Sequence, residues 1–269
     1  MMRVLSVQDL SCLGKCSLTV ALPVLSSMGC AATALPTTLL STHTAFPKPH
    51  RRSLTDDLLP ICDHWKSIGA EFDTVSTGYL ADPEQVEAVG KVLDAFPNAL
   101  HIVDPVMGDH GRLYSSITQD HVRAMKTLCA RADVILPNVT EAAMLTGLPY
   151  RETADPGYYR QLLAGMENFG ANAVILTGVS LEEGKLGCFG KDEQGEFSCQ
   201  NEKIDRQCHG TGDLFAAVVA GAMTRGKPCR EAAQLAAEFT YRVVENTPAS
   251  TPFGVEFEKC LPWLWENMK

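Results

Sequence analysis

A glycine-rich segment that directly precedes an apolar stretch is the strongest chemical signal in this sequence. His209-Gly210-Thr211-Gly212-Asp213 leads into the small apolar residues of Leu214–Ala222. Glycine permits a backbone in which successive amides point the same way, and at a helix start those amides and the helix dipole attract an anion. We therefore expect a phosphate site with the Asp213 carboxylate beside it. The alternative is that Asp213 only caps the helix.

Carboxylates also follow a predicted buried strand. The segment Asp104-Pro105-Val106-Met107-Gly108-Asp109 comes directly after Leu100–Val103, and open α/β sheets bind ligands at the carboxyl ends of their strands. Two acids there can hold Mg²⁺ directly or through water. The alternative is an Asp-Pro turn with a solvated Asp109. Further along, Asn138 and Glu141 have the spacing of a capping box at a helix start.

Short β-branched runs alternate with amphipathic segments over the first two thirds of the chain, which predicts repeated βαβ units. The predicted strands are Val4–Val7, Thr33–Leu40, Thr74–Thr77, Leu100–Val103, Val134–Leu136 and Ala173–Leu176. The predicted helices are Ser17–Met28, Leu54–Ile68, Pro83–Phe96, Gln119–Arg131, Glu141–Thr146 and Pro156–Phe169. This pattern indicates an α/β fold with a mostly parallel, doubly wound central sheet and helices on both faces.

Two other segments break the alternation. Lys185–Phe189 and Glu196–Glu202 flank a turn and predict a β-hairpin, which is followed by the helices Asp213–Thr224 and Cys229–Asn246. The proline-broken polar stretch Ala45–Ser53 is expected to be a loop and a small lid. The hairpin thus precedes the glycine-rich segment.

Composition narrows the classes of function. The 269 residues suit one domain spanning 1–269, and a net charge of -9 gives nucleic acid little attraction. No apolar run reaches the roughly 18 residues of a membrane span, and the N-terminus lacks the pattern of a signal peptide. Ten irregularly spaced cysteines are typical of reduced thiols. We therefore expect a cytoplasmic protein that acts on a small molecule.

Five segments occur together in the order found in one kinase family. They are Ser6-Val7-Gln8-Asp9, Leu40-Ser41-Thr42-His43-Thr44, Asp104–Asp109, Pro137-Asn138-Val139-Thr140-Glu141 and Gly210–Asp213. With these segments the chain resembles the pyridoxal/pyridoxamine kinases of the ribokinase superfamily, from about Arg3 to the last helix. The resemblance implies a ribokinase-like fold, a homodimer, and transfer of a phosphoryl group from ATP to the 5′-hydroxymethyl group of a B6 vitamer.

The resemblance also implies roles for individual residues. Asp213 would act as the base, and Gly210, Thr211 and Gly212 would form an anion hole. ATP and Mg²⁺ would be held by Asp104, Asp109, Asn138, Glu141, Thr177, Thr211 and Gly212, with Asp104 and Glu141 at the metal. A monovalent cation such as K⁺ is left open. The vitamer would contact Ser6, Asp9, Cys16, His43, Thr44, Tyr79 and Asp213.

Several alternatives stay open at this point. Thr177 could satisfy a strand-end amide instead of a phosphate, and Tyr79 could be a half-buried core aromatic. A Cys208 thiolate beside His209 could add to the aldehyde of pyridoxal. No Walker-type Gly-x-x-x-x-Gly-Lys-Ser/Thr is present, and no Gly-x-Gly-x-x-Gly follows the first strand, which argues against a P-loop enzyme and a dinucleotide oxidoreductase.

The substrate is less certain than the reaction class. Asp9 stands where the better-known pyridoxal kinases usually have serine, and Leu40 stands where an aromatic residue often closes their ring pocket. Gln8-Asp9-Leu10-Ser11 is also similar to the Asp-x-Ser opening of hydroxymethylpyrimidine kinases. The rivals are therefore a hydroxymethylpyrimidine (phosphate) kinase on the same scaffold and a vitamin-binding protein without catalysis.

Overall fold

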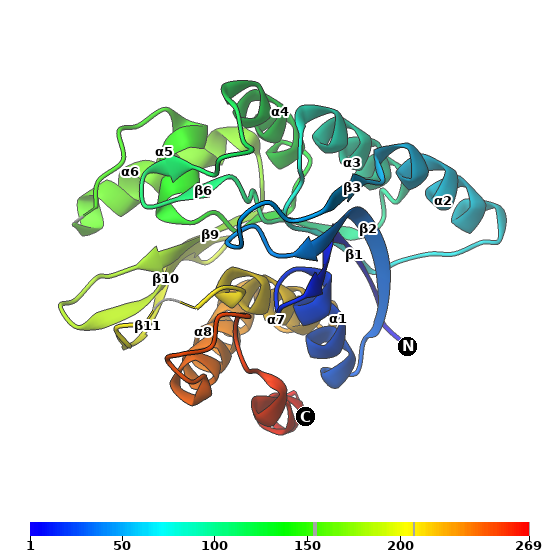
Figure 1. Cartoon of the computed structure of the whole chain (residues 1–269). Helices are drawn as coiled ribbons and strands as arrows, with labels where there is room; N and C mark the ends of the chain where they lie inside the picture. The colour runs from blue at the N-terminus through cyan, green and yellow to red at the C-terminus, as the bar shows by residue number, and fades with distance from the viewer. Residues whose placement is uncertain (153–154, 207, 269) are drawn as a thin grey trace.

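A nine-stranded sheet runs through the part of the chain that the computed structural model describes, residues 1–152, 155–206 and 208–268 (Figure 1). In chain order its strands are β1 (Arg3–Leu13), β2 (Ala31–Thr42), β3 (Arg51–Ser53), β4 (Thr74–Thr77), β5 (Leu100–Val103), β8 (Val134–Ile135), β9 (Ala173–Val179), β10 (Lys185–Asp192) and β11 (Gly195–Glu202). Their spatial order is β11-β10-β9-β8-β5-β4-β1-β2-β3. The six inner strands are parallel, whereas β3, β10 and β11 pair antiparallel at the edges.

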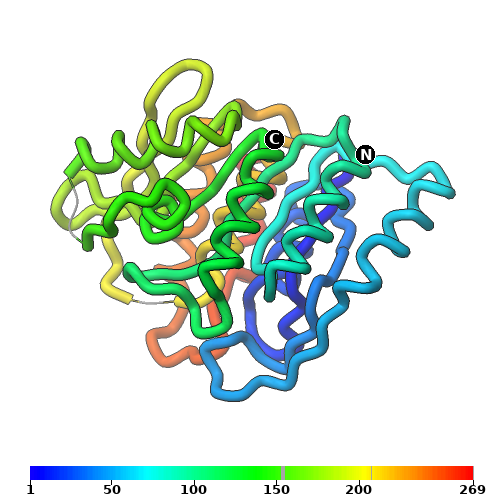
Figure 2. The backbone as a smooth tube through the Cα atoms, turned by 90° about the horizontal axis from the view of Figure 1, so that it is seen from above, coloured from blue at the N-terminus to red at the C-terminus, as the bar shows by residue number. Residues whose placement is uncertain are grey.

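Helices cover both faces of this sheet. They are α1 (Leu18–Ser27), α2 (Thr55–Ser67), α3 (Pro83–Ala95), α4 (Gln119–Cys129), α5 (Val139–Thr146), α6 (Pro156–Met166), α7 (Thr211–Thr224), α8 (Cys229–Asn246) and α9 (Leu261–Glu266). Figures 1 and 2 show α2 to α6 side by side above the sheet, while α1, α7 and α8 lie below it. The predicted α/β fold with helices on both faces is confirmed.

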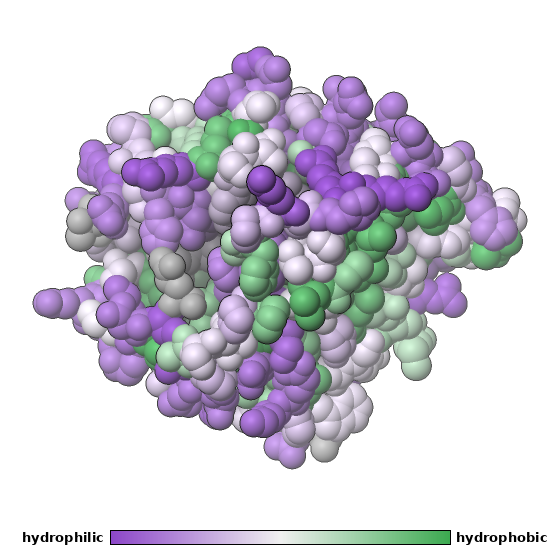
Figure 3. Space-filling view, viewed as in Figure 1, coloured by the Kyte–Doolittle hydropathy of each residue, from purple (hydrophilic) through white to green (hydrophobic). Residues whose placement is uncertain are grey.

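Successive side chains of each strand point to opposite faces of the sheet and pack into two separate cores. Leu5 and Val103 pack into the upper core with α2 to α6, and Val4 and Ile102 pack into the lower core with α1, α7 and α8. A strand that is buried on both faces has apolar residues in succession, which is why the sequence shows short continuous apolar runs. Outside the cores, Figure 3 shows mostly hydrophilic side chains over the upper helices and a band of hydrophobic residues across the middle of this face.

The first strand extends well beyond the predicted Val4–Val7. β1 continues to Leu13 because it pairs with β2 along its whole length, with one register shift between Gln8 and Leu10. Polar residues that looked like a loop in the sequence are therefore held in the sheet. This extension places Asp9 inside a strand at the carboxyl edge of the sheet.

Two short pairings were also missed. The expected loop Ala45–Ser53 ends in β3, which pairs with Thr38–Leu40 along the free edge of β2. The expected Asp-Pro turn continues into a small hairpin formed by β6 (Gly108–Asp109) and β7 (Arg112–Leu113). The pairing of β3 depends on a distant partner strand, whereas β6 and β7 are joined directly by the two-residue turn His110-Gly111. Among the described residues, no helix is long and apolar enough to cross a membrane.

Candidate active site

The glycine-rich segment forms the N-terminus of α7. Gly210 is the N-cap and has a left-handed backbone with φ of 90°, so the helix begins two residues before the predicted Asp213. The first amides of a helix have no intrahelical acceptor. A Cβ added at Gly212 would meet no atom within 4 Å, whereas one at Gly210 would lie 2.3 Å from the Lys15 carbonyl oxygen. The Lys15 carbonyl therefore packs against the helix start at Gly210, whereas no atom covers Gly212, so an anion can approach the helix there.

Asp213 lies half-buried in the first turn of α7. Burial raises its pKa to about 6; the nearby backbone of Ser17 lowers the pKa, and the charge of Asp9 raises it. A carboxylate with this pKa is ionised at neutral pH and is still basic enough to accept a proton. The side chain is thus suited to act as a general base.

A second group of carboxylates lies close to Asp213. Asp104 follows β5 and is 8% exposed, and Glu141 lies in the first turn of α5 and is 3% exposed. Burial, then the charges of Glu141 and Asp213, raise the pKa of Asp104 well above its usual range. Burial raises the pKa of Glu141 to about 8 against the opposing effect of hydrogen bonds from backbone amides. Burial therefore favours the protonated forms of Asp104 and Glu141 in this acidic group.

The capping box predicted from the sequence is present. The Glu141 amide donates to Asn138 Oδ1 at 2.9 Å, and the Asn138 amide donates to Glu141 Oε2 at 2.8 Å. Glu141 Oε1 accepts from the Met107 amide at 3.0 Å, and Asn138 Nδ2 donates to the Gly108 carbonyl at 2.8 Å. These bonds tie the start of α5 to the segment after β5.

The donor set fits Mg²⁺ that is bound mainly through phosphate and water. Among the described residues no group of three His, Cys, Asp or Glu side chains is arranged to hold a metal by itself. No hydrogen bond from the described chain holds the Asp104 carboxylate, so its oxygens can face a cation, whereas both Glu141 oxygens already accept from amides. Mg²⁺ commonly keeps several waters and takes only one or two carboxylates from the protein.

The remaining residues predicted to contact the nucleotide gather at the same edge. The Thr177 amide donates to the Pro137 carbonyl at 2.9 Å, and Thr177 forms a bridge with Asn138. The Thr177 side chain is only partly buried, and Gly178 beside it has no side chain to offer. Asp109 is exposed in β6, and its charge acts on Glu141.

Residues predicted to contact a ring substrate are split between open and enclosed positions. His43 packs against His209, with ring centroids 4.8 Å apart, and its Nε2 lies 3.2 Å from the Pro252 carbonyl oxygen. Thr44 is exposed directly before the expected lid segment Ala45–Ser53. Tyr79 is half-buried, and its hydroxyl lies 3.0 Å from Ser116 Oγ. Both the pocket role and the core role proposed for Tyr79 are compatible with this position.

The other three have partners within the protein. Ser6 is 1% exposed and accepts from Gln8 Nε2 at 2.8 Å. Asp9 is 2% exposed and accepts from Ser11 and Ser17 hydroxyls at 3.0 and 2.5 Å. Burial and then the charge of Asp213 raise the pKa of Cys16 to about 12, so its thiol stays protonated beside the base. Substrate contacts by these residues remain predictions.

Comparison with known proteins decides the family. A model of the phosphomethylpyrimidine kinase family matches residues 25–255. The chain belongs to the phosphomethylpyrimidine kinase family. Among solved structures it is similar to pyridoxal kinase from Lactobacillus plantarum, with 34% identity, a TM-score of 0.91, and 99% of this chain and 98% of that one covered.

Two other proteins are similar to this chain over most of its length. One is a protein from Bacteroides thetaiotaomicron that is provisionally assigned as a phosphomethylpyrimidine kinase and was crystallised with pyridoxal. It is 33% identical with a TM-score of 0.92, and the match covers 98% of this chain and 95% of that one. The other is the pyridoxine/pyridoxal/pyridoxamine kinase of Bordetella bronchiseptica, 29% identical over 91% of this chain and 89% of that protein. Both substrate readings are therefore represented among the relatives.

Tyr114 was not predicted as a site residue, but it lies beside the acidic group. Burial and the charges of Glu141, Asp109, Asp104 and Asp213 raise the pKa of its phenol, so the hydroxyl stays protonated and able to donate to an anion. Its closeness to Glu141 and Asp213, which are far away in the sequence, could not be read from the sequence. Cys208 gives the opposite result: burial raises the pKa of its thiol, which disfavours the thiolate that addition to an aldehyde requires.

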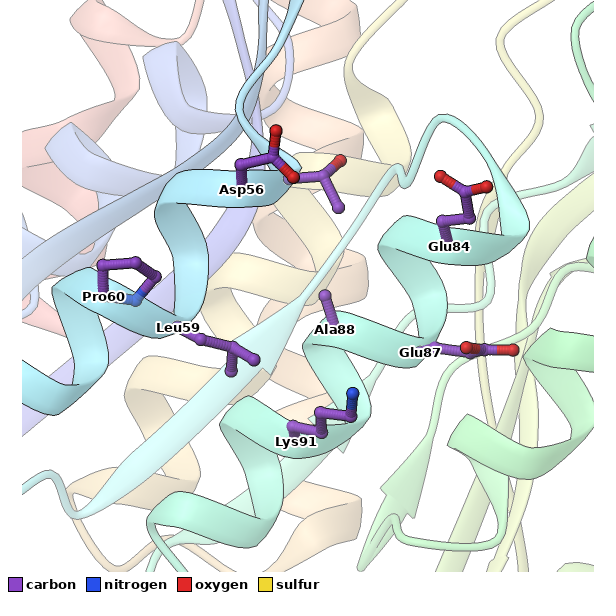
Figure 4. A pocket seen from close by; sticks show the side chains of 8 residues that line it. Asp56, Leu59, Pro60, Glu84, Glu87, Ala88 and Lys91 are labelled. Carbon is purple, nitrogen blue, oxygen red and sulfur yellow. The ribbon is translucent and has the colours of Figure 1, made fainter.

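A surface groove elsewhere holds none of the predicted residues. It lies between α2 and α3, has a volume of about 370 Å³, and is lined by side chains such as Leu59, Ala88 and Lys91 (Figure 4). Its walls are the outer sides of two helices, away from the sheet edge. The candidate site is the edge where β5, α5 and α7 meet, because most of the predicted residues lie there.

Proposed function

We propose that this chain transfers the γ-phosphoryl group of ATP to the 5′-hydroxymethyl group of a B6 vitamer. The observation that carries the proposal is the Asp213 carboxylate at the open start of α7, close enough to Asp104 for its charge to raise the pKa of that carboxyl. Phosphoryl transfer needs alignment of the reacting groups and stabilisation of charge more than covalent help. This arrangement supplies both at one place.

The proposed roles are consistent with where these residues lie. Asp213 takes the proton of the substrate hydroxyl, and the amides of Gly212 and its neighbours at the start of α7 stabilise negative charge on the transferring phosphoryl. Asp104, with Glu141 acting through water, would hold Mg²⁺, which neutralises the phosphates when bound. Asp109, Asn138 and Thr177 border the place where the nucleotide phosphates would lie.

The vitamer is proposed to lie between the end of β1, the segment around His43 and Thr44, and Tyr79. The kinase of Lactobacillus plantarum and the pyridoxal-containing structure from Bacteroides thetaiotaomicron support this choice, because both match almost the whole chain. A hydroxymethylpyrimidine substrate is the second candidate. Asp9 favours it, since this carboxylate matches the Asp-x-Ser opening of those kinases.

Asp213→Asn is the decisive variant. The side chains have almost the same shape, so the variant should fold, bind ATP and lose about 10² to 10⁴-fold in kcat, which is what a positioned base contributes. Turnover is measured by mass spectrometry of phosphorylated product, and ATP binding by titration calorimetry. Wild-type kcat in Asp213→Asn would refute the role of Asp213.

A substrate panel separates the candidates. Wild-type protein with Mg²⁺ and ATP is offered pyridoxal, pyridoxine, pyridoxamine, hydroxymethylpyrimidine and ribose in parallel. Highest kcat/KM for a B6 vitamer supports the proposal, and highest kcat/KM for hydroxymethylpyrimidine supports the second candidate. Vitamer binding without any phosphorylated product would favour a binding protein. The implied homodimer is a separate prediction, which light scattering tests.

A further inference from the structure

Four aromatic rings from three separate segments form a row beside the glycine-rich segment. The ring of His209 packs against that of His43, and His43 packs against Phe46, with centroids 4.8 Å apart in both pairs. Phe46 stacks on Phe253, with centroids 5.6 Å apart and an angle of 26° between the rings. His43 and Phe46 lie after β2 at the expected lid, whereas Phe253 belongs to the C-terminal segment. The row therefore joins the lid, the glycine-rich segment and the C-terminal segment.

The backbone that carries Phe253 is held in place on both sides. The Lys15 amide donates to the Phe253 carbonyl at 2.7 Å. Two residues later, the Val255 amide donates to the His209 carbonyl at 3.1 Å. A Cβ added at Gly254 would lie 2.6 Å from the Lys15 carbonyl oxygen and 3.1 Å from that of His209, so only glycine fits between the two segments. The Phe253 ring thus projects from a backbone that is fixed against the glycine-rich segment.

On the lid side, the same row is attached less firmly. The Phe46 amide donates to the His43 carbonyl at 3.2 Å and closes a turn that contains the exposed Thr44. His43 is buried, and its Nε2 lies 3.2 Å from the Pro252 carbonyl oxygen. The Phe253 ring, in contrast, is 41% exposed, and Phe46 is only partly buried. The stack of Phe46 on Phe253 is therefore the contact in this row that can open without disturbing the core.

We infer that Phe253 is a positioning residue: its ring, stacked on Phe46, holds the lid segment Ala45–Ser53 against the glycine-rich segment. This inference rests on the proposed function, because it takes this site as the place where ATP and the vitamer meet. A closed lid keeps water from the reacting phosphoryl group. The stack therefore keeps Thr44 beside the vitamer and limits transfer of the phosphoryl group to water, which would yield ADP and inorganic phosphate.

Phe253→Ala tests the inference, because it removes the ring and leaves the backbone hydrogen bonds in place. It should raise the KM for pyridoxal about two- to tenfold, the size expected for one aromatic pair, with the KM for ATP within about twofold of wild type. The ADP formed in excess of vitamer phosphate, per vitamer phosphate, should rise by a similar factor. Both products are measured by mass spectrometry of the same sample. Phe253→Tyr keeps the ring and should restore both values.

A double-mutant cycle tests whether Phe253 acts through the lid. Phe46→Ala removes the stack from the lid side and should show the same two changes, and the double variant Phe46→Ala/Phe253→Ala should be no worse than Phe46→Ala alone. Trp265→Ala is the control: it removes a 47% exposed ring from α9, at the bottom of Figure 1, and should keep both wild-type values.

Two results would overturn the inference. One is a wild-type KM for pyridoxal with a wild-type excess of ADP in Phe253→Ala, whatever its kcat, because a ring that only stabilises the fold would leave both values unchanged. The other is additive effects in the double variant. If wild-type protein phosphorylates none of the panel substrates, the proposed function fails instead.

Discussion

At the scale of single residues, the site is defined by carboxylates placed where ionisation is unfavourable. Burial is the largest cause of the raised pKa values of Asp213, Asp104 and Glu141. Raised pKa values at a sheet edge are typical of functional sites, where burial is used to tune the protonation of the reacting groups. Asp213 differs from the other two because its pKa of about 6 lies just below neutrality.

The pH dependence of turnover follows from Asp213. Because the base must be ionised, kcat/KM should be constant near neutrality and fall below about pH 6, approaching tenfold per pH unit. The measurement is kcat/KM for pyridoxal from pH 5 to pH 9. Asp213→Asn provides the control, since its residual rate should show no such acid limb; an identical limb in both proteins would assign it to another group.

At the scale of elements, the start of α7 depends on segments far away in the chain. The Lys15 carbonyl oxygen lies against Gly210 and also against Gly254, leaving no room for a Cβ at either residue. The Val255 amide donates to the His209 carbonyl at 3.1 Å. The loop after β1 and the C-terminal segment thus pack against the glycine-rich loop and fix its position.

Substitutions at the two glycines should therefore behave differently. Gly212→Ala places a methyl group in open space on the anion side, so it should fold with unchanged stability and raise KM for ATP about tenfold or more. Gly210→Ala should lower the unfolding temperature, because it combines a φ of 90° with the close Lys15 carbonyl. Thermal unfolding and ATP titrations measure both effects.

Gly226→Ala is the matched control for this pair. Gly226 has a φ of 87° but no atom within 4 Å of an added Cβ. Its substitution therefore reports the backbone strain alone, and Gly210→Ala should be the less stable of the two. Equal unfolding temperatures of Gly210→Ala and Gly226→Ala would show that the close Lys15 carbonyl does not destabilise Gly210→Ala.

At the scale of the whole molecule, one sheet separates two cores and gathers the acidic group at its edge. The folded protein holds a proton on Glu141 up to about pH 8, whereas the unfolded chain releases it near the ordinary value of 4.5. Between these values the folded state binds more protons than the unfolded state, so its stability falls as the pH rises. The acidic group thus makes the ligand-free fold less stable at alkaline pH.

This linkage gives a stability prediction. The unfolding temperature of the ligand-free protein should be higher at pH 5.5 than at pH 8, by about 5 °C, and Mg²⁺ with ATP should reduce the difference by neutralising the carboxylates. Asp104→Asn should also reduce it, because it removes one of the two coupled charges. Differential scanning calorimetry measures each case. If the unfolding temperature of Asp104→Asn differed between pH 5.5 and pH 8 as much as that of wild type, the pH dependence of stability would come from other groups.

Most elements, and the chemistry at several of their ends, could be predicted from local sequence alone. The strands Thr74–Thr77 and Leu100–Val103 and the helix Cys229–Asn246 have the predicted bounds, because local periodicity and end signals specify such segments. The capping box of Asn138 and Glu141 was also predictable, since its residues are neighbours in the chain. The kinase family, too, followed from motifs that the family comparison confirms.

How distant segments meet could be seen only in the folded chain. The length of β1, the edge pairing of β3, and the approach of Tyr114 to Glu141 and Asp213 all depend on partners far away in the sequence. Local sequence fixes what a residue can donate or accept, but packing of the whole chain selects the partner.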